Sequence, residues 1–230
     1  MRLIENITEV FRHPRRSWVE DGIVILGRGA SLARLTDFSE NIQRVLLVNA
    51  FWDNLNDKIP YYQDSIIHNF IKDKELILVC NPGEDRKDIK RFLKRYKTKA
   101  RFQTSFDKVV RVKTPKKYFR NFPNEVIIPF QHLQENFHYV GSLGAAILLC
   151  KYKYRIKKFF IFGLDFFEHG YYLNHMDYYN NPESDYASVM EYSDLTKDTW
   201  TKFMEYHSDC QFNVYTYANF EGKDNIFVYR

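Results

Sequence analysis

The sequence is poor in cysteine and has no long hydrophobic run. Its three cysteines, Cys80, Cys150 and Cys210, lie far apart and form no CxxC pair. An odd number of isolated cysteines argues against a disulfide framework, so a reducing compartment is expected. Residues 1–19 are polar and charged, and no stretch reaches the roughly 18 apolar residues of a membrane-spanning helix. We therefore expect neither a signal peptide nor a transmembrane segment.

Excess charge of either sign is also small. The 34 Lys and Arg residues are nearly balanced by 29 Asp and Glu, which leaves a net charge of +5. A dedicated nucleic-acid binder carries a stronger and more clustered excess, so no nucleic-acid partner is expected. Basic runs at 12–16, 90–99 and 151–158 are either solvated helix faces or surfaces that attract phosphates or anionic membranes. We expect a cytoplasmic protein whose 12–16 run contacts the inner face of the membrane peripherally.

Aromatic residues, in contrast, are abundant. Phe, Trp and Tyr make up 17% of the 230 residues, within a hydrophobic share of 45%. The rings either fill a large core or form stacking surfaces for bases or sugars. A chain of this length can bury most of its apolar surface in one core. The expectation is one domain at 21–230 behind an N-terminal arm at 1–20, and the oligomeric state stays open, a homo-oligomer included.

Short apolar runs alternate with helical patterns along the chain. The runs lie at 22–26, 44–49, 76–80, 157–163, 212–217 and 225–229, with a weaker one at 108–112. Helical spacing of apolar residues marks 84–97, 145–152 and 194–207. This alternation predicts an α/β fold with a Rossmann-like, doubly wound and mainly parallel sheet. Residues 166–193 follow no pattern, which in a compact domain is typical of a lid or binding loop.

The first candidate site is the glycine turn that ends the first apolar run. Positions 27–31 read G-R-G-A-S, so Gly27 and Gly29 flank Arg28, and Ser31 opens the next segment. Glycines at a strand end let backbone N–H groups approach a phosphate or ribose. The pattern lacks the third glycine of G-x-G-x-x-G and the Lys of a P-loop. An ordinary tight turn is the alternative interpretation.

Three further candidates lie where strands end or helices begin. Asn49 ends the second apolar run, and the carboxyl ends of strands are where ligands collect. Ser142 and Gly144 open an apolar helix whose N-terminus suits an anion. Asp165 places a carboxylate just after the fourth run. Each candidate also has a purely structural interpretation. Asn49 is then an ordinary turn residue, Ser142 and Gly144 allow close packing of the helix, and Asp165 caps a turn.

Metal ligation is not supported by the sequence. The seven histidines include no H-x-x-x-H pair, and no Asp-x-Asp triplet occurs. We therefore expect no divalent metal site. His169 and His175 lie in the expected lid with Asp177, where either one is a general base or an ordinary loop residue.

Four segments together resemble a known family. They are G-R-G-A-S at 27–31, V-N at 48–49, G-S-L-G-A-A-I-L-L at 141–149 and K-K-F-F-I-F-G-L-D-F-F at 157–167. They resemble the bacterial lipooligosaccharide sialyltransferases of glycosyltransferase family 42, and more distantly the animal-type sialyltransferases. In the bacterial family the first turn reads G-N-G-P-S-L, and the later strand closes with G-I-D-F-Y.

The resemblance implies a GT-A-variant-like sialyltransferase fold with a flexible lid. It implies a CMP-activated donor sugar, with sialic acid as the family's example, and an inverting transfer to a hydroxyl of a glycan or glycolipid. No metal and no further cofactor take part. A histidine serves as general base, and two tyrosines support the departing phosphate.

Strand-end placement and the resemblance together give a set of candidate residues. Donor contacts are assigned to Gly27, Arg28, Gly29, Ser31, Asn49, Ser142, Gly144, Asp165 and Tyr172. The catalytic candidates are His175 and Tyr192.

The chain departs from the family at several of these places. Arg28 replaces an Asn, and Phe167 and Leu173 stand at the two tyrosine positions, with Tyr172 adjacent. Tyr192 stands where the family has its basic histidine. The alternative to an enzyme is therefore a non-catalytic nucleotide-binding protein that keeps the fold.

Overall fold

The structure is a computed structural model that describes a defined part of the chain. The described residues are 22–48, 51, 61–79, 137, 140–169, 172 and 186–230. The expected arm at 1–20, the helix at 84–97 and the strand at 108–112 lie outside them.

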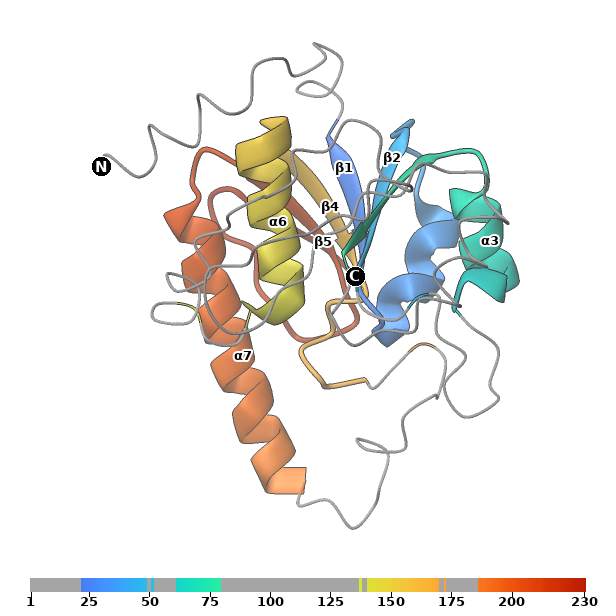
Figure 1. The fold of residues 1–230 in the computed structure, drawn as a ribbon. Coiled ribbons are helices and arrows are strands. Elements are labelled where there is room, and N and C mark those ends of the chain that lie inside the picture. The colour runs from blue at the N-terminus through green and yellow to red at the C-terminus, as the bar shows by residue number, and fades with distance from the viewer. Residues whose placement is uncertain are drawn as a thin grey trace.

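The described strands build a parallel sheet in the order β3-β2-β1-β4-β5-β6 (Figure 1). Each pair of neighbours in this sheet runs parallel. An order that winds outward in both directions from β1 is that of a doubly wound, Rossmann-like sheet, so the predicted fold class is confirmed. The strands are β1 (Ile23–Leu26), β2 (Arg44–Val48), β3 (Glu75–Val79), β4 (Lys158–Phe162), β5 (Gln211–Tyr215) and β6 (Ile226–Tyr229).

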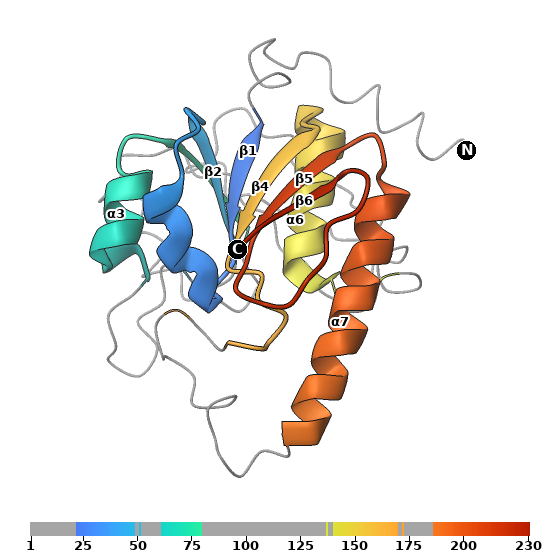
Figure 2. The same cartoon turned by 180° about the vertical axis from the view of Figure 1, so that it is seen from behind.

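Helices cover both faces of the sheet, as Figures 1 and 2 show from opposite sides. On one face lie α6 (Gly141–Tyr154) and α7 (Tyr186–Tyr206). On the other lie the 3-10 helix η1 (Ala30–Asp37) and α3 (Ser65–Ile71). The short 3-10 helix η3 (Tyr61–Gln63) leads into α3. The result is a three-layer domain.

The four residues of β1 show how the sequence produces these layers. Their side chains point alternately to the two faces, and all four are fully buried, at 0% exposure. Ile23 and Ile25 pack with α6 and α7, whereas Val24 and Leu26 pack with η1 and α3. A strand buried on both faces has no polar positions, which explains why continuous apolar runs predicted the strands.

The direction of the strands determines where polar groups gather. All strands end at one edge of the sheet, and α6 begins at that same edge before running back to the start of β4 (Figure 1). Residues 27–29 and 141–144 therefore both lie at this carboxyl edge.

Two helices differ from the predictions. The helix predicted at 194–207 begins at Tyr186, so residues 186–193 of the expected lid are helical. α3 was not predicted, because it is too short to show a long periodic pattern of apolar residues. Its start depends instead on a capping side chain. The carboxylate of Asp64 accepts hydrogen bonds from the amides of Ile66 and Ile67 and so begins the helix.

Asn225 joins the end of α7 to the last strand. Its amide nitrogen Nδ2 lies 3.0 Å from the carbonyl oxygen of Met204, 3.3 Å from that of His207 and 2.8 Å from that of Cys210. The last carbonyls of a helix have no intrahelical partner. One side chain therefore satisfies carbonyls at the helix end and in the turn that follows it.

This arrangement predicts different effects for two substitutions. Asn225→Ala should lower the free energy of unfolding by about 1–3 kcal/mol, because buried acceptors lose their donor. Asn225→Asp should cost more, since a carboxylate would face carbonyl oxygens and the negative end of α7. Urea unfolding measures both, with Asn41→Asp on the surface as control. An Asn225→Asp protein as stable as Asn225→Ala would contradict this interpretation.

Candidate functional site

The carboxyl ends of β1 and β4 are pressed together at glycines. The amide of Gly27 donates to the carbonyl oxygen of Phe162 at 2.7 Å, and the amide of Gly29 donates to that of Gly163 at 3.0 Å. A Cβ on Gly27 would lie 2.5 Å from the oxygen of Gly163, which is too close for any side chain. Gly163 itself has a φ of +74°, which favours glycine. The glycines thus allow two strand ends to meet.

We call this contact between residues 27–29 and 162–163 the joint. A buried carboxylate connects a third segment to it. Asp165 is 3% exposed. Its Oδ2 accepts the amide of Ser31 at 2.8 Å. Its Oδ1 accepts the Thr216 hydroxyl at 2.9 Å and the Tyr217 amide at 3.0 Å, both just after β5. Asp165 therefore connects the ends of β1, β4 and β5.

The joint corrects the role expected for the glycine turn. The amides of Gly27, Gly29 and Ser31 donate to acceptors within the protein. The Ser31 hydroxyl oxygen also accepts the amide of Gly163, at 2.9 Å. A phosphate was expected at the positive N-terminal end of η1. The negatively charged carboxylate of Asp165 occupies that position instead. These amides are satisfied, so any phosphate contact has to come from other groups at the edge.

Arg28 lies at the rim of the joint beside two tyrosines. Its carbonyl oxygen accepts the amide of Tyr172 at 2.9 Å and the hydroxyl of Tyr61 at 3.2 Å. The Tyr172 hydroxyl donates to Oδ1 of Asp64 at 3.3 Å. Burial, and then the Asp64 charge, raise the pKa of Tyr172, so its phenol stays protonated at neutral pH. The structure thus places Tyr61 and Tyr172 against the backbone of Arg28.

Tyr61 and Asp64 are contacts that sequence reasoning missed. Asp64 had a local signal, since an Asp just before an apolar helical turn is a common N-cap. Tyr61 had none, because its contact with Arg28 depends on how β1 and η3 are placed in space.

On the β5 side, Glu168 and His169 follow Asp165. Glu168 accepts the amine of Lys197 on α7 and, at 2.9 Å, the amide of Asn219. Burial opposes its ionisation, but the hydrogen bonds from Lys197 and Asn219 outweigh burial and lower the pKa of Glu168. The exposed ring of His169 places Nε2 2.9 Å from the carbonyl oxygen of Tyr217.

The helix that opens with Ser142 and Gly144 packs tightly at its start. A Cβ on Gly144 would lie 2.4 Å from Cγ2 of Val140, so close packing requires this glycine. Ser142 occupies the first turn of α6, and Tyr192 lies within α7. Asn49 and His175 lie outside the described residues.

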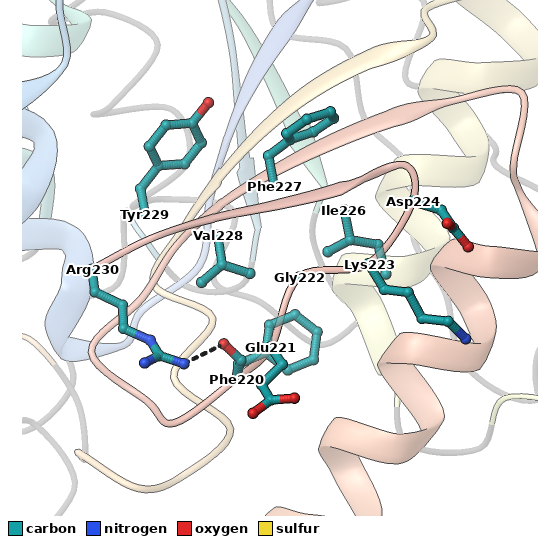
Figure 3. A pocket seen from close by; sticks show the side chains of 10 residues that line it. All are labelled: Phe220, Glu221, Gly222, Lys223, Asp224, Ile226, Phe227, Val228, Tyr229 and Arg230. Atoms are coloured by element: carbon teal, nitrogen blue, oxygen red, sulfur yellow. Dashed lines mark hydrogen bonds between the residues drawn. The ribbon is translucent and has the colours of Figure 1, made fainter.

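An open hollow of about 850 Å³ lies beside β6, away from this joint (Figure 3). It is lined by residues 220–224 and 226–230, including Arg230, whose guanidinium donates to the carbonyl oxygen of Phe220 at 2.8 Å. Because β6 is separated from β1 by β4 and β5, the hollow is not part of the candidate site.

Two kinds of feature are absent from the described part of the chain. Within it, no group of His, Cys, Asp and Glu residues is arranged to hold a metal ion. No helix among the same residues has both the length and the apolar character needed to cross a membrane.

Comparison with known proteins gives one distant structural likeness. No protein-family profile matches the chain, and no curated protein sequence matches it. Among solved structures, the chain is similar to the crystal structure of the sialyltransferase CST-II in complex with trisaccharide acceptor and CMP. The alignment covers 88% of this chain and 87% of that one, with 13% identity and a TM-score of 0.35. A likeness at this level assigns no function.

Two glycine substitutions separate steric overlap from backbone strain. Gly27→Ala should cost about 2–3 kcal/mol of unfolding free energy, because the new methyl group overlaps Gly163. Gly141→Ala should cost about 1–2 kcal/mol, because its φ of +51° is strained while nothing lies within 4 Å. Urea unfolding compares the two. If Gly141→Ala loses more stability than Gly27→Ala, the close approach of Gly27 to Gly163 is not the stronger constraint, and our description of the joint is wrong.

The Glu168–Lys197 pair predicts a pH effect on stability. The folded pKa of Glu168 lies below its unfolded value of about 4.3, so its contribution is complete above that pH and falls as acid protonates it. Lys197→Met should raise the folded pKa and flatten the loss of melting temperature between about pH 5 and 3. Lys202→Met, which breaks an exposed pair with Asp198, is the control. Identical pH profiles for wild type and Lys197→Met would refute this assignment.

Proposed function

We propose that this chain is a metal-independent glycosyltransferase of the sialyltransferase type. It transfers a sugar from a CMP-activated donor to a hydroxyl of a glycan or glycolipid, in the cytoplasm and peripherally at the inner face of the membrane. The observation that carries the proposal is the point between β1 and β4 where the strand order reverses. In open α/β sheets, ligands bind outside the carboxyl ends of the strands at this point.

The groups at this edge suit a nucleotide with a negatively charged phosphate. Arg28 supplies a cation directly after β1. The protonated phenol of Tyr172 donates to Asp64, and it is proposed to turn this hydrogen bond to the phosphate when the nucleotide binds. The N-terminus of α6, with Ser142 in its first turn, adds positive potential at the same edge. Asn49, at the end of the second strand run, is proposed to contact the nucleoside.

The chemistry follows from the donor. Transfer needs a base that takes the proton of the acceptor hydroxyl and groups that stabilise the phosphate leaving with CMP. Arg28 and Tyr172 are proposed for the leaving phosphate, while Tyr192 stands at the family's base position and His175 is the lid histidine proposed to take its place. The motif resemblance at 27–31 and 141–167 supports the CMP donor in particular.

One observation favours a second function, a nucleotide-binding protein without catalysis. Phe167 stands where the family has its first phosphate-contacting tyrosine, and a phenyl ring donates no hydrogen bond. Tyr192 replaces the family's basic histidine. Both changes leave the nucleotide pocket intact while removing parts of the transfer machinery.

CMP binding tests the proposal directly. CMP should raise the melting temperature, because a ligand at about 100 times its Kd adds about 2.7 kcal/mol of stability. CDP should act similarly. Arg28→Met should weaken the shift, whereas Lys157→Met, an exposed cation beside Asp209, should leave it unchanged.

The absence of any shift with pyrimidine nucleotides at millimolar concentration would reject both functions. Binding of CMP without hydrolysis or transfer, over a panel of CMP-sugars and acceptors, would favour the non-catalytic protein.

A further inference from the structure

The carboxyl edge holds several titratable side chains in the described part of the chain, and most are fully engaged. Asp165 accepts three donors with its two oxygens. Glu168 is paired with Lys197 and also accepts the amide of Asn219. Asp64 caps α3 and accepts the Tyr172 hydroxyl. His169 differs from them, because it is exposed and its hydrogen bond to a described residue is made by Nε2.

The contact of His169 determines which ring nitrogen carries the proton. Nε2 lies 2.9 Å from the carbonyl oxygen of Tyr217, and a carbonyl oxygen can only accept a hydrogen bond. In the neutral ring Nε2 therefore carries the hydrogen, and Nδ1 keeps its lone pair. A neutral imidazole with one nitrogen anchored to a carbonyl and the other open is the form that accepts a proton.

Tyr217, whose carbonyl oxygen contacts His169, is itself held in place by Asp165. The amide of Tyr217 donates to Oδ1 of Asp165 at 3.0 Å, and its carbonyl accepts His169. The rings of His169 and Tyr217 also meet edge to face, with centroids 6.2 Å apart. Asp165 thereby positions His169 through the backbone of a single residue, Tyr217.

Charged and polar groups lie beside the ring of His169. Glu168 precedes it in the chain, and its carboxylate interacts electrostatically with the ring. Lys197 on α7 is partly neutralised by its pair with Glu168. Asp165 and the Tyr217 phenol are the other titratable groups of the described loops beside the ring.

His169 and Tyr172 are held by different strand ends. His169 contacts the segment after β5, whereas the amide of Tyr172 donates to the carbonyl oxygen of Arg28 after β1. β4 lies between these two strands in the sheet. The ring of His169 and the group proposed for the leaving phosphate therefore come from different parts of the carboxyl edge.

We propose that His169 is the general base of the transfer, an inference that rests on the proposed function. The acceptor oxygen bonds to the anomeric carbon of the donor sugar while the bond from that carbon to the phosphate oxygen breaks. That electron pair leaves with CMP, and the acceptor proton passes to Nδ1 of His169. The imidazolium then returns the proton to water. Tyr192 is a poorer base, since a tyrosine has a pKa of about 10.

Donor turnover measures this role, with CMP-sialic acid as the probe and CMP release as the readout. His169→Gln keeps an amide donor for the Tyr217 carbonyl but has no titratable group. Its kcat should fall about 100-fold or more, while the CMP-induced rise in melting temperature stays at the wild-type size. His169→Ala should lose a similar amount and recover part of it in added imidazole, which a purely structural role would not produce.

Two controls locate the effect. His68→Gln removes a histidine from α3 and should leave turnover unchanged, and His175→Gln should change turnover far less than His169→Gln. Wild-type turnover retained within about 3-fold in His169→Gln, or a loss confined to His175→Gln, overturns the inference and leaves the proposed function standing.

A second measurement does not depend on turnover. In NMR spectra of protein with labelled histidine, neutral His169 should carry its hydrogen on Nε2. A neutral ring that carries its hydrogen on Nδ1 overturns the inference. Wild-type protein that binds no CMP rejects the proposed function, and this role of His169 with it.

Discussion

A carboxylate buried at the end of a strand needs hydrogen-bond donors, because an unpaired buried charge is strongly destabilising. Asp165 finds three donors in two other segments: the amide of Ser31 after β1, and the hydroxyl of Thr216 and amide of Tyr217 after β5. This single side chain therefore fixes the relative positions of three strand ends. The groups at the carboxyl edge, on both sides of the joint, take their places from it.

The joint also determines how the edge can meet a ligand. Because Gly27, Gly29 and Ser31 use their amides within the protein, the start of η1 already has its negative partner. Under the proposed function, recognition then falls to side chains at the rim, such as Arg28 and Tyr172, and to the start of α6. The first glycine turn serves close packing of β1 against β4.

Sequence reasoning found the strands because their chemistry is local. β1 and β4 are buried on both faces, so each is a continuous apolar run that ends at a glycine. α3 escaped prediction because seven residues carry too few apolar positions to show a period, and its start depends on Asp64. The expected lid was too long at its C-terminal side, because residues 186–193 form the first turns of α7.

The candidate site was predictable in its positions but not in its contacts. Strand ends and glycines marked Gly27, Gly29 and Asp165, since these features are read along the chain. The partners of Asp165 at Thr216 and Tyr217 lie just after β5, 51 and 52 residues along the chain, and no local pattern shows such a contact. For the same reason, the orientation of the His169 ring emerged only from the folded chain.

Native-state hydrogen exchange in wild type and Asp165→Asn tests the central joint most directly. An asparagine has the same shape but turns one acceptor into a donor. We expect the amides of Ser31 and Tyr217 to lose protection together, while Ile25 in the middle of β1 stays protected. Unchanged exchange at both amides, or a loss at only one of them, would show that Asp165 does not hold the strand ends together.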